Sequence, residues 1–188
     1  MVVVGSILVS LLVLLLALIV VVIAIYNGLV RSRLRTREAW SAIDVQLKRR
    51  ADLVPNLVEV VRGYAAHEQD TLTEVIRARG ALQQAQGANQ AAEADNMLTQ
   101  ALGRLFAVVE AYPQLKASDN FMALQRDLYD IEDKVAYARQ FYNRNVLDFN
   151  IRIQVFPQSI LAAIFGFTPA EFFESKEAQG NVSVSFKK

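Results

Sequence analysis

The strongest constraint on this chain is the apolar segment from Val2 to Ile25, since no charged side chain occurs before Arg31. A helix that crosses the hydrocarbon core of a bilayer needs roughly 20 predominantly apolar residues, and this segment is long enough to span with some tilt. A secretory signal peptide would instead carry a positive residue first, then a shorter apolar stretch and a small-residue cleavage site. The sequence therefore predicts an uncleaved transmembrane anchor.

Arginines follow the anchor at once, and basic residues beside a span stay on the cytoplasmic side. We therefore expect the N-terminus outside and the C-terminal domain in the cytoplasm. Tyr26 lies where an interfacial aromatic residue belongs. Two phenylalanines near the C-terminus are expected to return to the same level. The predicted membrane-interface residues are Tyr26, Arg31, Arg33, Arg35, Arg37, Phe165 and Phe167.

The composition narrows the classes of partner. The formal net charge is +1, so no strong positive field points to nucleic acid, and the early arginines are better explained by anionic lipid headgroups. The chain contains no cysteine, which excludes disulfides and cysteine-ligated metals. We expect the lipid bilayer to be the first partner.

The clearest soluble helix is predicted from Ser118 to Asn150, where apolar residues recur at 3-4 spacing. Such a heptad seam packs lengthwise against other helices with a shallow crossing angle. Asn145 falls on the seam, and two interpretations stay open: a buried polar residue that fixes register, or a helix that drifts so that Val146 takes the position. The seam residues are Phe121, Leu124, Leu128, Ile131, Val135, Ala138, Tyr142, Asn145 and Phe149.

Three further helices are predicted before this one. The apolar pattern from Trp40 to Tyr64 continues past Pro55, so we favour a kinked helix that continues from the anchor over a new helix capped by Asp52. Helices are also expected from His67 to Gln84 and from Ala94 to Tyr112, the latter stopped by Pro113. The polar stretch Gln83–Gln90 is expected to be a loop. Short connections predict an all-α fold, an antiparallel four-helix bundle with long coiled-coil-like helices.

The C-terminal part has a different character. Ile151–Val155 alternates like a short strand. Pro157–Phe165 is expected to be a short apolar helix, and Thr168–Glu171 has the pattern of a capping box that starts another. We favour packing of Phe156–Phe173 on the bundle or a neighbouring subunit over insertion into the membrane interface. The expected division is an anchor at 1–30, a cytoplasmic bundle at 31–155, an aromatic element at 156–173 and a weakly ordered tail at 174–188.

Several short motifs occur between the anchor and Phe173: Tyr26-Asn27-x-Leu29-Val30, Ala39–Arg50 (AWSAIDVQLKRR), Asp52–Val58 (DLVPNLV), Gly63-Tyr64-Ala65-x-His67-Glu68, Tyr142-Asn143, Phe156-Pro157 and Phe165-Gly166-Phe167. Together they resemble the LemA family, and beyond Phe173 we find no matching motif. The resemblance implies a bacterial membrane protein with an N-terminal anchor and a cytoplasmic four-helix bundle. From the anchor and the basic residues after it, we expect the protein in the inner (cytoplasmic) membrane. It implies no reaction and no catalytic residue.

The residues themselves offer no catalytic, cofactor or metal site. His67 is the only histidine, so paired Glu-x-x-His metal ligands of the di-iron type are absent. No phosphate-binding loop, Gly-rich dinucleotide turn or nucleophile elbow occurs. The carboxylates Asp127, Asp130, Glu132 and Asp133 are interpreted as a solvated helix face, with a salt bridge to another subunit as the alternative.

A mixed-charge stretch near the start of the bundle is the remaining candidate. Arg50 falls near the apolar seam, where an unpaired charge is costly, so Asp44, Asp52 or a carboxylate of the facing helix is the candidate partner. The functional interpretation is a partner-binding or intersubunit cluster. The structural one is an intrachain ion pair that fixes helix register, or a long side chain that keeps its charge exposed at the surface, and we favour the structural interpretation. The cluster comprises Asp44, Lys48, Arg49, Arg50 and Asp52.

The prediction for function is a non-enzymatic, membrane-anchored helical scaffold that forms homo-oligomers and organises or shapes the membrane or partner membrane proteins. The alternative is an adaptor or signalling subunit that binds one partner membrane protein through the bundle. No cofactor is expected.

Overall fold

In the computed structural model, which describes residues 2–174, the first helix extends without interruption from the apolar segment into the polar part of the chain. This helix, α1, comprises Val2–Tyr64 and contains Pro55. The prediction of a single continuing helix is therefore confirmed. It is also the one helix within the described residues that is long and apolar enough to cross a membrane.

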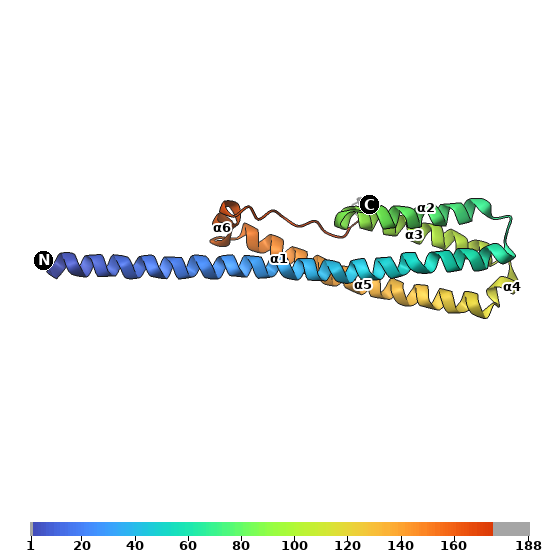
Figure 1. The fold of residues 1–188 in the computed structure, drawn as a ribbon, viewed down its shortest axis with the longest axis horizontal. Helices are drawn as coiled ribbons and strands as arrows, with labels where there is room; N and C mark the ends of the chain where they lie inside the picture. The colour runs from blue at the N-terminus through green and yellow to red at the C-terminus, as the bar shows by residue number, and fades with distance from the viewer. Residues whose placement is uncertain (1, 175–188) are drawn as a thin grey trace, which may run out of the picture. The chain divides into compact units, whose positions relative to one another are not determined.

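The remaining elements are also helices. They are α2 (Gln69–Gln84), α3 (Gly87–Val109), the short α4 (Pro113–Lys116), the long α5 (Asp119–Gln154) and the short α6 (Gln158–Ile164). Residues 2–174 contain no β-strand, which confirms the all-α class (Figure 1).

Several boundary predictions are wrong for identifiable reasons. Most of the predicted strand Ile151–Val155 belongs to α5, which continues to Gln154 because Phe149 and Ile153, one helical turn apart, share a buried face. The expected loop Gln83–Gln90 shrinks to Ala85 and Gln86, because Gly87 adopts a φ of +81° that turns the chain directly into α3.

Three other predictions are settled by hydrogen bonds and burial. The capping-box segment Thr168–Glu171 forms no helix, because Asn150 engages both backbone groups of Ala170 instead. Pro113 does not end α3, which stops at Val109; it begins α4. At the seam of α5, Val146 is fully buried, which favours helix drift over a register-fixing Asn145.

The chain divides into two compact units, each assembled from separated stretches. The first contains Met1–Glu38 and Arg144–Ala170, and the second contains Ala39–Asn143 and Glu171–Lys188. The expected tail at 174–188 lies, apart from Glu174, outside the described residues. The expected four-part division of the chain stays a prediction.

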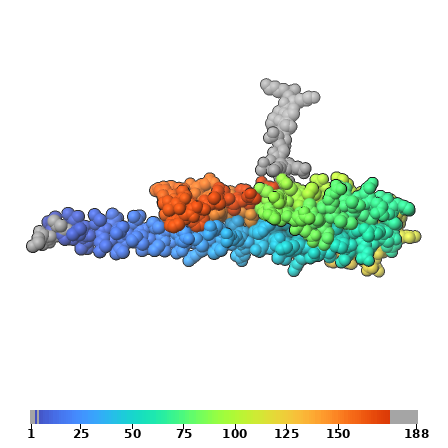
Figure 2. Space-filling model, turned by 45° about the horizontal axis from the view of Figure 1, so that its top comes forward, coloured from blue at the N-terminus to red at the C-terminus, as the bar shows by residue number. Residues whose placement is uncertain are grey.

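The first unit has a small core where α1, the end of α5 and α6 meet. It contains Leu29 of α1, Phe149 and Ile153 of α5, Ala162 of α6 and Phe167 beyond it. The small side chains of Ser32 and Thr36 in α1 are buried beside α5. The hydroxyl of Thr36 donates to the carbonyl of Asn145 in α5 at 3.3 Å. The blue helix and the orange-red C-terminal element contact each other in Figure 2.

The second unit is held together by one apolar face from each of its long helices. Polar contacts join the same helices: Arg79 of α2 reaches the carbonyl of Ala51 in α1, and Arg104 of α3 pairs with Glu74 of α2. Between α3 and α5, the rings of Phe106 and Phe121 lie 6.2 Å apart. The fully buried side chains include Ile43, Val54, Leu57, Val61, Leu72, Val75, Leu98, Leu105 and Phe121.

Candidate functional site

An aromatic cluster forms in the first unit, at the end of the apolar segment of α1. The Tyr26 ring lies 4.7 Å from that of Phe165 and 6.1 Å from that of Phe167. The Arg33 guanidinium lies over the Phe167 ring, 4.9 Å from its centroid, in cation–π geometry. The structure therefore brings together four of the predicted interface residues, Tyr26, Arg33, Phe165 and Phe167.

The other three predicted arginines lie outside this cluster. Arg31, Arg35 and Arg37 are exposed on α1. Helical spacing explains the difference for Arg31 and Arg35, which point away from the side of α1 that carries Arg33, whereas Arg37 is one helical turn beyond Arg33 on the same side. Arg31 and Arg35 are therefore exposed side chains, whereas Arg33 is held against the ring of Phe167.

A Schellman motif at the end of α6 directs Phe167 back to α1. The Phe167 N–H donates to the carbonyl of Ala162 at 2.9 Å, and the Gly166 N–H donates to that of Ala163. Gly166 has a φ of +68°, a left-handed conformation that glycine adopts without strain. The Phe165-Gly166-Phe167 motif is thus a chain reversal that places two rings beside Tyr26.

Two asparagines of α5 hold the segment after Phe167, one in each unit, and sequence reasoning did not assign them this role. Asn150 accepts from the Ala170 N–H at 2.8 Å and donates to its carbonyl at 2.9 Å. Asn143 does the same for Phe173, at 2.8 Å and 3.3 Å. The sequence feature that could have indicated this role is the seven-residue spacing of the two asparagines, which puts both amides on one side of a helix.

Tyr142 fixes the same segment in the second unit. Its hydroxyl donates to the Glu171 carbonyl at 2.8 Å, and its ring lies 5.5 Å from that of Trp40. Burial, and to a lesser extent the charge of Glu171, raises the pKa of Tyr142 to about 12.

The raised pKa gives a prediction for alkaline stability. The pKa of Tyr142 is about 12 in the folded state, whereas the ordinary pKa of tyrosine is 10.0. The stability linked to this proton is therefore complete below pH 10 and is lost as the pH rises through 12. We expect Tyr142→Phe to lower the free energy of unfolding at neutral pH by about 1 kcal/mol, through the lost hydrogen bond, and to flatten the alkaline decline. Urea unfolding at several pH values tests this, with the exposed Tyr64→Phe as control. An unchanged alkaline decline in Tyr142→Phe contradicts it.

The structure separates the mixed-charge stretch into parts. The Arg50 side chain is 3% exposed, and its guanidinium lies 2.5 Å from the Asp95 carboxylate of α3. The half-exposed Glu132 of α5 lies 3.9 Å away. Asp44 and Lys48 form a separate ion pair one helical turn apart on the surface. Arg49 and Asp52 are exposed, so the five residues make a buried pair and a solvated face rather than one cluster.

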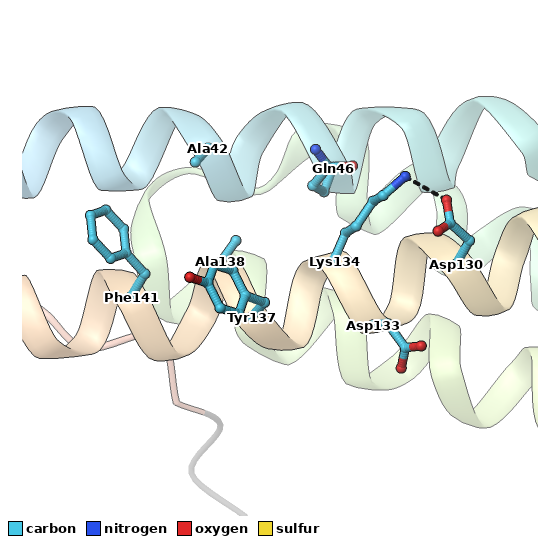
Figure 3. A pocket seen from close by; sticks show the side chains of 8 residues that line it. All are labelled: Ala42, Gln46, Asp130, Asp133, Lys134, Tyr137, Ala138 and Phe141. Atoms are coloured by element: carbon cyan, nitrogen blue, oxygen red, sulfur yellow. Dashed lines mark hydrogen bonds and ion pairs between the residues drawn. The ribbon is translucent and has the colours of Figure 1, made fainter.

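A groove lies between α1 and α5 of the second unit, with a volume of about 480 Å³ (Figure 3). Its floor is largely apolar, yet the buried Oε1 of Gln46 has no hydrogen-bond partner within residues 2–174. Two aromatic rings stand beside it, with Tyr137 76% exposed and Phe141 51% exposed. The lining residues are Ala42, Gln46, Asp130, Asp133, Lys134, Tyr137, Ala138 and Phe141.

The residues that line the groove are suited to binding another protein more than to catalysis. Lys134 is paired with Asp130 at 2.5 Å. Within residues 2–174, no three histidine, cysteine, aspartate or glutamate side chains gather as metal ligands would. What the groove presents is an apolar concavity flanked by aromatic rings and charges, the composition of a protein-binding surface.

The sequence profile of the LemA family matches residues 39–186. The chain belongs to the LemA family. The resemblance inferred from the motifs is thereby confirmed. The match begins at Ala39, after the Tyr26-Asn27 motif, and it extends beyond Phe173, where we found no motif.

Relatives of this LemA-family chain include magnetosome proteins. It is 32% identical over 179 residues to magnetosome protein MamQ 2 of Paramagnetospirillum magneticum and 29% identical to MamQ of Magnetospirillum gryphiswaldense. Each alignment covers 81% of this chain and 66% of the relative, so the chain spans just under two thirds of their length. Protein LemA of Metamycoplasma hominis is 24% identical, over 81% of this chain and 70% of that protein. None of these names denotes an enzyme.

Proposed function

We propose that this LemA-family protein is a non-enzymatic, membrane-anchored helical scaffold at the cytoplasmic face of the bacterial inner membrane. Its subunits self-associate and thereby organise or shape the membrane or partner membrane proteins. The anchoring rests on α1, whose apolar side chains are left uncovered by the part of the chain that the structure describes: Leu14 is 71% and Leu18 59% exposed. Such a surface needs an apolar environment, and a bilayer supplies one.

We further infer that α1, α2, α3 and α5 form an antiparallel bundle in the second unit. The two-residue connection between α2 and α3 supports this, since short loops join antiparallel neighbours. The contacts of α1 with α2 and α3, and of α3 with α5, have the pattern that such a bundle requires. A bundle of this kind is rigid and presents long faces to neighbouring subunits.

The groove between α1 and α5 is the observation that carries self-association. Tyr137 is 76% exposed in the single chain. Tyrosine rings are enriched at the buried centres of protein interfaces, so an exposed ring beside a groove is a candidate contact for another subunit. Small side chains, Ala42 and Ala138, hollow the surface beside it. A neighbouring subunit that inserts an apolar side chain there would cover both rings, and an N–H or O–H group beside that side chain would donate to the unpartnered Oε1 of Gln46.

The size of the detergent-extracted full chain tests self-association. We expect a uniform species of many subunits for the native chain and a much smaller one for the double variant Tyr137→Ala, Phe141→Ala, because truncating interface aromatics typically costs 2 kcal/mol or more per hot spot. Mass photometry or native mass spectrometry gives the mass. The control is Tyr64→Ala, which removes a ring that is 48% exposed at the end of α1. A native chain that is monomeric overturns the scaffold, and a single added membrane protein that binds the monomer would favour the adaptor.

The orientation has its own test, made simple by the absence of cysteine from the chain. We expect a cysteine introduced for the exposed Met97 to react with a membrane-impermeant maleimide in inverted membrane vesicles and not in intact spheroplasts, because the arginines after the anchor hold the second unit inside. Labelling in intact spheroplasts would place that unit outside the cell.

A further inference from the structure

The short helix α6 and its flanks present apolar side chains that nothing in the described chain covers. Phe156 is 80% exposed, Ile160 53%, Ile164 68% and Phe165 50%. Ile160 and Ile164 are one helical turn apart and therefore share a side of α6. We call these four residues the α6 apolar face. We propose that this face lies in the membrane interface, in contact with lipid of the leaflet from which α1 emerges.

The depth of this face follows from its contact with Tyr26. The Phe165 ring lies 4.7 Å from that of Tyr26, directly after the apolar segment ends at Ile25. Arg31 follows Tyr26 at a helical rise of about 1.5 Å per residue, so the first cation lies roughly 7–8 Å further along α1. Tyr26 thus marks the boundary between acyl chains and headgroups, and α6 lies at that level.

Three contacts hold α6 at this position on α1. Phe167 is 8% exposed and packs on Phe149, with ring centroids 6.4 Å apart. The Arg33 guanidinium lies over the Phe167 ring, 4.9 Å from its centroid. Asn150 pairs with both backbone groups of Ala170. Because all these residues belong to the first unit, the depth of α1 in the bilayer sets the depth of α6.

Two observations favour lipid as the occupant of the face. The first is continuity, because Ile23, three residues before Tyr26, is 53% exposed and belongs to the segment that the bilayer surrounds. The second is charge, because the exposed Arg31 and Arg35 lie just beyond the aromatic cluster, where anionic headgroups would meet them. An apolar face bordered by basic residues is the pattern of an interfacial element.

The consequence is a two-point attachment. The inference rests on the proposed anchoring of α1, to which it adds a wedge in one leaflet only. An element that enters one leaflet beside a span enlarges the cross-section of the protein on that side. Such an asymmetry gives the scaffold a physical means of shaping membrane, which a single straight span lacks.

Spin-label accessibility tests the proposal, using the full chain reconstituted in vesicles of phosphatidylcholine and phosphatidylglycerol. Since the native chain has no cysteine, Ile164→Cys and Ile160→Cys each carry one nitroxide label. We expect oxygen, which concentrates in acyl chains, to relax both labels several-fold more effectively than a water-soluble nickel chelate does. Leu15→Cys serves as the lipid control and Met97→Cys, at a 48% exposed site of α3, as the water control.

The controls separate failure of this inference from failure of the anchor. If the Leu15 label is in lipid while both α6 labels match the Met97 label, the anchor stands and the interfacial position of α6 is wrong. If the α6 labels are shielded from both reagents, protein covers the face, as a second copy would, and the proposal is overturned. A Leu15 label that meets the nickel chelate overturns the anchor and this inference together.

Discussion

Replacement of Asp95 by alanine is expected to lower the free energy of unfolding by about 3 to 5 kcal/mol, because it leaves a buried guanidinium without its partner. The Arg50 side chain is 3% exposed and lies 2.5 Å from the Asp95 carboxylate. Glu132 at 3.9 Å is half exposed and can compensate only in part. Urea unfolding of the full chain in detergent measures the effect, through the fluorescence of Trp40, the only tryptophan.

Two further variants show whether the buried charge is the cause. Asp44→Ala breaks the exposed pair with Lys48 and is expected to cost at most about 0.5 kcal/mol. The double variant Arg50→Met, Asp95→Leu removes both charges and should recover most of the loss, because apolar residues of similar volume replace buried ion pairs well. If Asp95→Ala costs no more than Asp44→Ala, water reaches Arg50 and the pair contributes little.

Burial along the helices could be predicted from the sequence, because a 3-4 spacing of apolar residues is a local property. The predicted seam of α5 includes Phe121, Leu128, Val135 and Tyr142, all of which are buried. The same reasoning placed Arg50 near the apolar seam and offered Asp44, Asp52 or a carboxylate of the facing helix as its partner. It could not choose Asp95, since that partner is 45 residues away on a helix whose rotation the periodicity does not fix.

At the C-terminal element, the error arose where a distant partner outweighed a local signal. Thr168–Glu171 has the sequence of a helix start, yet the Ala170 N–H bonds to Asn150, 20 residues away, in place of a helical turn. The aromatic cluster is another case. Tyr26 was predicted at the interface from its position after the apolar segment, and Phe165 from the return of the last long helix. Their direct ring contact depends on the turn at Gly166 and on the packing of Phe167.

The second large effect concerns the proline inside α1. Pro55 has no N–H, so the carbonyl of Ala51 loses its helical donor. Arg79 of α2 replaces that donor, with its Nε 2.8 Å from the Ala51 oxygen. Ala51 is 1% exposed, so water cannot easily take over. We expect Arg79→Leu to lower the free energy of unfolding by about 1 to 3 kcal/mol, the cost of an unsatisfied buried acceptor.

A double-mutant cycle with Pro55→Ala tests this explanation. Alanine at position 55 restores the N–H that bonds the Ala51 carbonyl, so Arg79→Leu should cost much less in that background than in the native chain. Arg77→Leu, at an exposed site two residues earlier, is the matched control and should change stability by less than about 0.5 kcal/mol. Equal costs of Arg79→Leu in both backgrounds would mean that Arg79 stabilises α2 against α1 by packing alone. If Arg79→Leu lowers the free energy of unfolding less in the Pro55→Ala background, then α1 tolerates Pro55 because α2 supplies the missing hydrogen-bond donor.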